Sequence, residues 1–168
     1  MRGYLFDTCA VSSLLNPRHQ HHSATRMVVA GLPHGAPQFV SIVTIGEMEF
    51  GLKMAEHASS THLAQFRTRI EAIKAYPVLD ITKHTASAFA ELKSQLALTV
   101  QRRANSQKLS RWLEDWIDAN TGKQLQIDEN DLWVAAQAKE RDFTLISGDE
   151  DMVRLSKVDS TIRFILAR

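Results

Sequence analysis

Near its start the chain reads Gly3-Tyr4-Leu5-Phe6-Asp7-Thr8, an apolar run that ends on an acid and a hydroxyl. The run predicts a buried strand, and a helix that begins at Thr8 because aspartate is a strong helix N-cap. A similar stretch, Phe143-Thr144-Leu145-Ile146, comes late in the chain, and Asp149 follows it by three residues. If the two strands are parallel neighbours, their acids meet at the edge of the sheet where open α/β sheets bind ligands.

Between these two stretches, strand and helix signals alternate. Strands are predicted at residues 3–6, 38–41, 76–81, 143–146 and 161–166. Helices are predicted at residues 8–15, 23–32, 45–58, 61–75, 82–100, 128–141 and 150–156. This alternation predicts an α/β fold, a three-layer α/β/α sandwich with a central, mostly parallel sheet. A length of 168 residues predicts a single domain over residues 1–168. A further helical segment is expected around residues 101–120.

The composition is that of an ordinary globular protein, with 44% apolar residues and a formal net charge of +1. This charge neither requires nor excludes a nucleic acid partner. No apolar run approaches the roughly 20 residues of a membrane span, and no signal peptide is recognisable. The single cysteine, Cys9, excludes an intramolecular disulfide and fits a reducing cytoplasm.

Two further acids lie in the first turns of predicted helices. Glu47 is the third residue after Thr44, so it fits a capping box with Thr44 as well as a functional site. Gly51, one turn later, would be explained if a neighbouring element or a ligand approached that face closely. Asp131 follows Asp128 and Glu129 at a helix start, where the helix dipole alone favours acids.

The other two acids have local explanations as well. Asp7 can serve purely as a helix cap. Asp149 and Asp151 are two residues apart, so either could reach a shared site, and Asp149 is preferred. Thr8 and Ser147 could supply supporting hydroxyl groups. Carboxylates gathered at one sheet edge repel one another, and a hard cation such as Mg²⁺ or Mn²⁺ relieves that repulsion. The pattern therefore predicts metal-assisted phosphodiester chemistry.

At this point the chain resembles the PIN-domain family, and within it the VapC-type toxins of bacterial toxin–antitoxin pairs. Four segments carry the likeness in the expected order, although Ser147 stands where threonine is usual. The segments are Tyr4 to Thr8, Ser41 to Glu47 with Gly51, Asp131 to Ala136, and Thr144 to Asp149. The resemblance implies a Mg²⁺- or Mn²⁺-dependent endoribonuclease that hydrolyses RNA. It implies that Asp7, Glu47, Asp131 and Asp149 are the catalytic and metal-binding residues.

The resemblance also implies a homodimer and a small antitoxin partner. An inserted Arg or Lys can block an acidic pocket, which gives the antitoxin a physical rationale. We expect its helix to dock on apolar surface of the early helices, and the candidate residues are Val28, Val29 and Leu32, or Met48 and Leu52.

Three other groups of residues invite functional interpretations. His19, His21 and His22 could bind a metal, but no second ligand pair stands at zinc spacing. Cys9 is better explained as a small core residue than as a nucleophile. A basic stretch could contact RNA, or could belong to a solvated helix whose Trp112 and Trp116 both face the core. Its residues are Arg102, Arg103, Lys108 and Arg111.

The main rival to a nuclease is a non-catalytic module of the same fold that binds RNA or protein. An aspartyl phosphatase is a weaker alternative, because Asp7-Thr8-Cys9 lacks the Asp-x-Asp arrangement of the common enzymes of that class. Binding of Mn²⁺ separates the rivals, since a module that has lost catalysis should bind the ion weakly.

Overall fold

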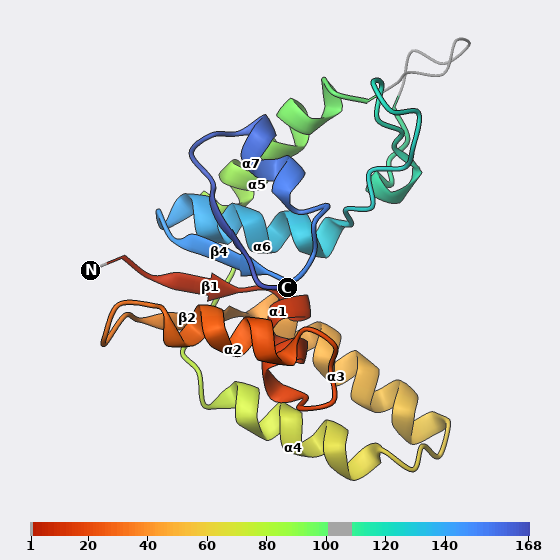
Figure 1. Ribbon diagram of the computed structural model, residues 1–168. Helices are drawn as coiled ribbons and strands as arrows, with labels where there is room; N and C mark the ends of the chain where they lie inside the picture. Colours follow the sequence, from red (N-terminus) through yellow and green to blue (C-terminus); the bar gives the residue numbers. More distant parts are fainter. Residues whose placement is uncertain (1, 101–108) are drawn as a thin grey trace.

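Figure 1 shows the computed structural model, which describes residues 2–100 and 109–168. Its centre is a sheet of parallel strands in the order β3-β2-β1-β4-β5. The strands are β1 (Tyr4–Phe6), β2 (Gln38–Ser41), β3 (Val78–Leu79), β4 (Thr144–Ser147) and β5 (Arg163–Leu166). The parallel sheet predicted from the sequence is confirmed, although β3 is shorter than the strand predicted at 76–81.

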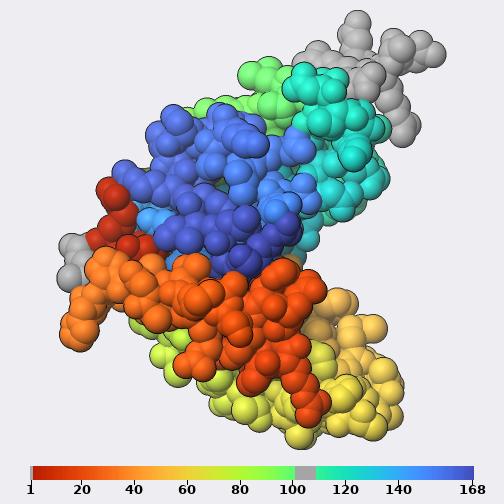
Figure 2. Space-filling model, viewed as in Figure 1, coloured from red at the N-terminus to blue at the C-terminus, as the bar shows by residue number. Residues whose placement is uncertain are grey.

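Helices cover both faces of the sheet, which confirms the three-layer α/β/α sandwich. One face carries α1 (Thr8–Leu15), α2 (His22–Ala30), α3 (Ile42–His57) and α4 (Leu63–Lys74). The other carries α5 (Lys83–Ala97), α6 (Glu129–Glu140) and α7 (Val153–Val158). At the surface, the orange and yellow of the first helices lie below the blue and teal of the C-terminal half (Figure 2). None of the helices in the described ranges has the length and apolar character needed to cross a membrane.

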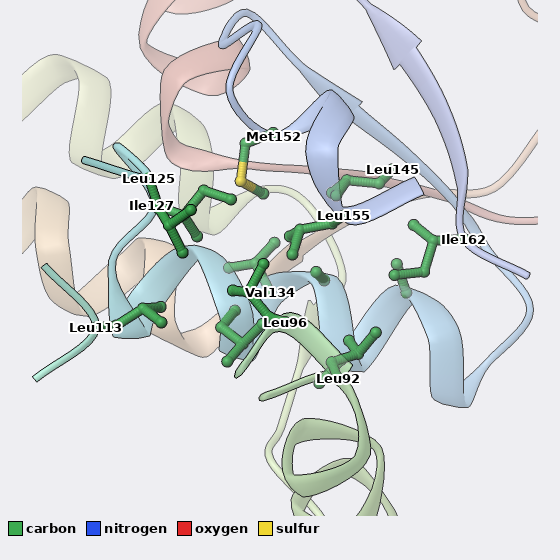
Figure 3. Packing of buried hydrophobic residues seen from close by; sticks show 14 of the residues in the cluster. Leu92, Leu96, Leu113, Leu125, Ile127, Val134, Leu145, Met152, Leu155 and Ile162 are labelled. Atoms are coloured by element: carbon green, nitrogen blue, oxygen red, sulfur yellow. The ribbon is translucent and has the colours of Figure 1, made fainter. Parts of the chain in front are cut away.

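The strands alternate their side chains between two apolar clusters, one on each face. Leu5 and Leu145 belong to the larger cluster, and Figure 3 shows Leu145 there beside Leu155 of α7. Phe6 and Ile146 belong to the smaller cluster, beneath α1 and α2. All four side chains are fully buried, which explains why both strands read as continuous apolar runs.

The sheet topology brings the ends of the central strands together. Strand β1 pairs with β2 on one side and with β4 on the other, so the chain reverses its winding direction at β1. Phe6 lies opposite Val40 and Ile146, and the backbone N–H of Asp7 donates to the carbonyl of Ile146 at 3.0 Å. A crevice at such a switch point is the usual ligand site of this architecture.

The helical segment predicted around 101–120 is wrong for the residues that the structure describes, and residues 101–108 lie outside them. A single 3-10 turn covers Leu113–Asp115. The Asp118 carboxylate explains the break, because it accepts hydrogen bonds from the backbone N–H groups of Asn120 and Thr121 at 2.8 and 2.9 Å. Without a helix the two tryptophans separate: Trp116 is buried and Trp112 is 57% exposed.

Candidate active site

Asp7 lies at the end of β1 and also caps α1, which are the two roles that its sequence context allows. It follows β1 directly, and its carboxylate caps α1 by accepting a hydrogen bond from the Ala10 N–H at 2.6 Å. The residue is only 3% exposed, so its carboxylate is almost fully removed from water. Capping and a place at the sheet edge are therefore compatible.

Glu47 does not form the predicted capping box with Thr44. Helix α3 begins earlier, with Ser41 as its cap and an N–H donated by Val43 at 2.9 Å, which places Glu47 in the second turn. The Glu47 carboxylate instead accepts hydrogen bonds from the Thr8 hydroxyl and from the Asn130 amide, the latter at 2.9 Å. Glu47 therefore links α3 to the starts of α1 and α6.

Asp131 lies at the start of α6, in a capping box that the sequence analysis did not name. Its backbone N–H donates to the Asp128 carboxylate at 2.9 Å, and its own carboxylate accepts from the Asp128 N–H at 3.0 Å. Glu129 forms an ion pair with Lys93 of α5. Asp131 thus carries a capping role alongside its position near the other acids.

The loop after β4 supplies the fourth acid. The Asp149 N–H donates to the buried Ser147 hydroxyl at 2.9 Å, and the Asp149 carboxylate accepts from the Asp151 N–H at 2.8 Å. Burial and the neighbouring Asp149 raise the pKa of Asp151. Asp149 is therefore held by its own loop, with Asp151 just beside it.

The four acids share one electrostatic environment. Burial above all, with smaller contributions from Asp149 and Glu47, raises the pKa of the Asp7 carboxyl to about 7. Burial likewise raises the pKa of Asp131 to about 7, with contributions from Asp128, Asp7 and Asp149. Within the described residues, none of the four acids forms an ion pair. Their charge is thus uncompensated by any described basic side chain.

The carboxylate oxygens of the four acids suit a hard divalent cation. Their side chains, however, are not oriented so that they surround a single ion. In the described part of the chain, no three His, Cys, Asp or Glu side chains converge closely enough to hold one ion. Asp131 is turned toward the Asp128 backbone, and Glu47 toward Thr8 and Asn130. The residues fit such a cation by chemistry and charge, and ligation requires an exchange of hydrogen bonds for the ion.

Two residues of the site were missed by the sequence analysis. Asn130 holds Glu47, and the Thr44 hydroxyl lies 3.1 Å from that of Thr8. Asn130 stands immediately before Asp131, yet no local signal indicates that α6 begins beside the second turn of α3. Thr44 was assigned to a cap because threonine is also a good capping residue.

Cys9 lies at the edge of this site rather than deep in the core. It is half-buried, and its Sγ lies 3.2 Å from the position that a Cβ would take at Gly148. Burial, reinforced by Asp7, Asp149 and Asp131, raises the pKa of the Cys9 thiol to about 11. A thiol with so high a pKa is a poor nucleophile, which supports the interpretation of Cys9 as a packing residue.

The three histidines lie between α1 and the first residue of α2, where His19 and His22 make structural contacts with the end of α1. His19 Nδ1 lies 2.9 Å from the Ser13 hydroxyl, and His22 Nδ1 lies 2.9 Å from the Ser13 carbonyl. The His19 and His21 rings are tilted at a centroid distance of 5.6 Å. These contacts fasten the loop to the end of α1.

The chain was compared with family models, with curated proteins and with solved structures. The family model for the PIN domain matches residues 4–158. No curated protein matches the chain. Among solved structures, VapBC-5 from Mycobacterium tuberculosis has a TM-score of 0.64 and 20% identity over 99% of each chain. VapBC2 from Rickettsia felis, bound to a promoter DNA fragment, has a TM-score of 0.63 and 13% identity over 98% of each chain.

A third similar structure is VapC20 from Mycobacterium tuberculosis, a toxin that cleaves the sarcin-ricin loop. Its TM-score is 0.53 and its identity 12%, over 90% of this chain and 94% of that one. Identities this low carry the fold and not the activity. The family match, in contrast, covers nearly the whole chain, and the observed sheet and helices agree with it. The chain belongs to the PIN-domain family.

Proposed function

We propose that the chain is a metal-dependent endoribonuclease that acts as the toxin of a toxin–antitoxin pair. The observation that carries the proposal is the group of uncompensated acids at the sheet switch point, two of them with a pKa near 7. RNA is proposed as the substrate because VapC20 is a sarcin-ricin loop cleaving toxin. The same acids disfavour the rival binding module, which has no use for costly buried carboxylates.

In this proposal Asp7, Asp131 and Asp149 hold the cation, and Glu47 ligates it or orients the attacking water. Bound there, Mg²⁺ or Mn²⁺ supplies an activated water and neutralises charge on the scissile phosphate. Thr8 and Asn130 donate to the Glu47 carboxylate from two sides, so at least one of these hydrogen bonds would be exchanged when Glu47 ligates the cation. Ser147 and the Ala10 N–H support Asp7, and both contacts oppose the rise of its pKa.

The chemistry of the products provides the test. Purified protein with Mn²⁺ should cut a labelled single-stranded RNA into fragments that carry 5′-phosphate and 3′-hydroxyl ends, because water is the nucleophile and the 3′ oxygen leaves. A contaminating metal-independent ribonuclease would leave a cyclic phosphate instead. Intact RNA after incubation with folded, metal-loaded protein would contradict the proposal.

The partner is proposed from the fold and the neighbours. Several similar structures are toxin–antitoxin complexes, including one from Klebsiella pneumoniae. A homodimer is proposed on family resemblance alone. Of the docking residues predicted on the early helices, Val28, Val29, Leu32 and Met48 are partly buried, because they pack against the smaller core cluster. Leu52 and Ile70 line a groove of about 430 Å³ between α3 and α4, whose other lining residues are charged, and we propose it for the antitoxin helix.

Expression of the chain alone in a bacterial host should slow growth, because a ribonuclease without its inhibitor degrades cellular RNA. The Asp7→Asn variant at equal abundance should leave growth unchanged. Growth curves with protein levels measured by immunoblot provide the readout. A soluble, metal-loaded wild type that is harmless would remove the toxin role and leave the nuclease proposal standing.

A further inference from the structure

A groove of about 750 Å³ lies beside the candidate active site, where α3 faces the start of α6. This volume is within the range of small-molecule sites. The residues that line it are mostly apolar: Ile42, Val43, Gly46, Glu47, Phe50, Ile81, Asn130 and Trp133. We call this surface the α3–α6 groove.

The groove is continuous with the acids. Glu47 and Asn130 line it, and they are also the hydrogen-bonded pair that belongs to the active site. An RNA strand whose phosphate lies at the acids therefore has an adjacent nucleotide within reach of the groove.

The walls of the groove suit the flat face of a base. Phe50 is 67% exposed and lines the groove, so its side chain is accessible to a ligand there. Trp133 is held by Phe89, against which it stacks at a centroid distance of 4.0 Å and an interplanar angle of 15°. Aromatic side chains of this kind bind unpaired bases by stacking, in sites that track single strands.

Gly46 provides an independent observation. It lies inside α3, where glycine costs about 1 kcal/mol relative to alanine. A Cβ at this position would meet no atom within 4 Å, so the fold does not require glycine there. The same holds for Gly51, so of the two explanations considered for that glycine, a close neighbouring element does not apply. Gly46, unlike Gly51, lines the groove, and its missing side chain keeps the groove open.

We propose that the α3–α6 groove binds an unpaired nucleobase of the RNA substrate, adjacent to the nucleotide whose phosphate is cleaved. The inference rests on the proposed function and extends it to single-stranded RNA with a base at this position. Phe50 and Trp133 would hold the base, and Gly46 would make room for it.

Direct binding tests this without relying on activity. Fluorescence anisotropy would follow a labelled single-stranded RNA and a matched RNA with one abasic site, each bound to protein in the Asp7→Asn background with Mn²⁺. Phe50→Ala and Gly46→Leu should each weaken binding of the intact RNA about tenfold, the magnitude expected for loss of one stacked base. Binding of the RNA whose abasic site faces the groove should be unchanged by either substitution.

Matched controls come from the same helix. Met54→Ala removes an apolar side chain that is also about half exposed but lies outside the groove. Gly46→Ala gains helix propensity and adds only one methyl group. Met54→Ala should bind RNA within twofold of the parent, whereas Gly46→Ala should bind it less tightly than the parent and more tightly than Gly46→Leu. Both Gly46 variants should melt at or above the temperature of the parent.

Three outcomes would overturn the inference. Equal affinity of Phe50→Ala and the parent for intact RNA would exclude stacking. A change in sedimentation coefficient without a change in RNA affinity would assign the groove to a contact between protein chains. Weakened binding of intact and abasic RNA alike would make the effect independent of a base. Failure of wild type to cleave any RNA would instead remove the proposed function itself.

Discussion

Replacing Asp7 with asparagine should abolish RNA cleavage while leaving the fold intact. Asparagine caps helices about as well as aspartate, so α1 should keep its first turn and its contact with Ala10. The substitution removes a charge that a divalent cation needs. Loss of an outer-sphere partner already costs 10- to 100-fold in metal sites, so loss of a ligand should cost more than about 100-fold. Initial rates of RNA cleavage at saturating Mn²⁺ provide the measurement.

The same substitution should raise the stability of the metal-free protein. The pKa of Asp7 is about 7 in the folded chain and near 3.8 when unfolded, so Asp7 destabilises the fold progressively as pH rises from about 4 to 7, and the cost is constant above that. At pH 8 the cost is on the order of 2–4 kcal/mol, which asparagine avoids. The gain in melting temperature should shrink as pH falls through 7 and vanish below about 4, where both states are protonated.

Asp142→Asn is the matched control. Asp142 is an exposed aspartate that pairs with Arg2 and Arg163, far from the acids at the other sheet edge. Its positive φ of 54° is one that asparagine tolerates well. This variant should cleave RNA like the wild type. Activity of Asp7→Asn within a few-fold of wild type would end the assignment of Asp7 as a ligand.

Elements fixed by local signals were predicted closely. The apolar run before Asp7 and the capping preference of aspartate gave β1, and the bounds of α1 were predicted without error. Residues 38–41 form β2 as predicted. In these segments, burial, periodicity and cap chemistry all favour the same structure, so the local preferences agree with the tertiary contacts.

Features that depend on partners distant in sequence were not predictable. Ser41 and Thr44 are both good caps, and the end of β2 in the sheet decides that Ser41 caps α3. Glu47 then finds Thr8 and Asn130, which come from segments 39 and 83 residues away. Likewise, Trp112 and Trp116 have helical spacing, but the Asp118 turn and its ion pair with Arg154 end any helix there.

Removal of divalent metal should stop cleavage, and Mg²⁺ or Mn²⁺ should restore it. The acids need a counter-charge, since burial above all, with smaller contributions from neighbouring acids, raises the pKa of Asp7 and of Asp131 to about 7. Ca²⁺ should restore activity poorly, because it is larger and holds oxygen ligands in looser geometry. Full activity in excess EDTA, with metal absent by elemental analysis, would rule out the mechanism.

Metal binding should also depend on pH in a defined direction. Because the folded pKa of both acids is raised, protons compete with the cation below about pH 7, and binding at pH 7 should release protons. Mn²⁺ should therefore raise the melting temperature strongly at pH 8 and little at pH 5. Titration calorimetry in two buffers of different ionisation enthalpy would count the protons released. Weak Mn²⁺ binding would favour the rival module that binds RNA or protein without cleaving it. If Mn²⁺ raised the melting temperatures of the wild type and of Asp7→Asn equally, the ion would bind away from these acids.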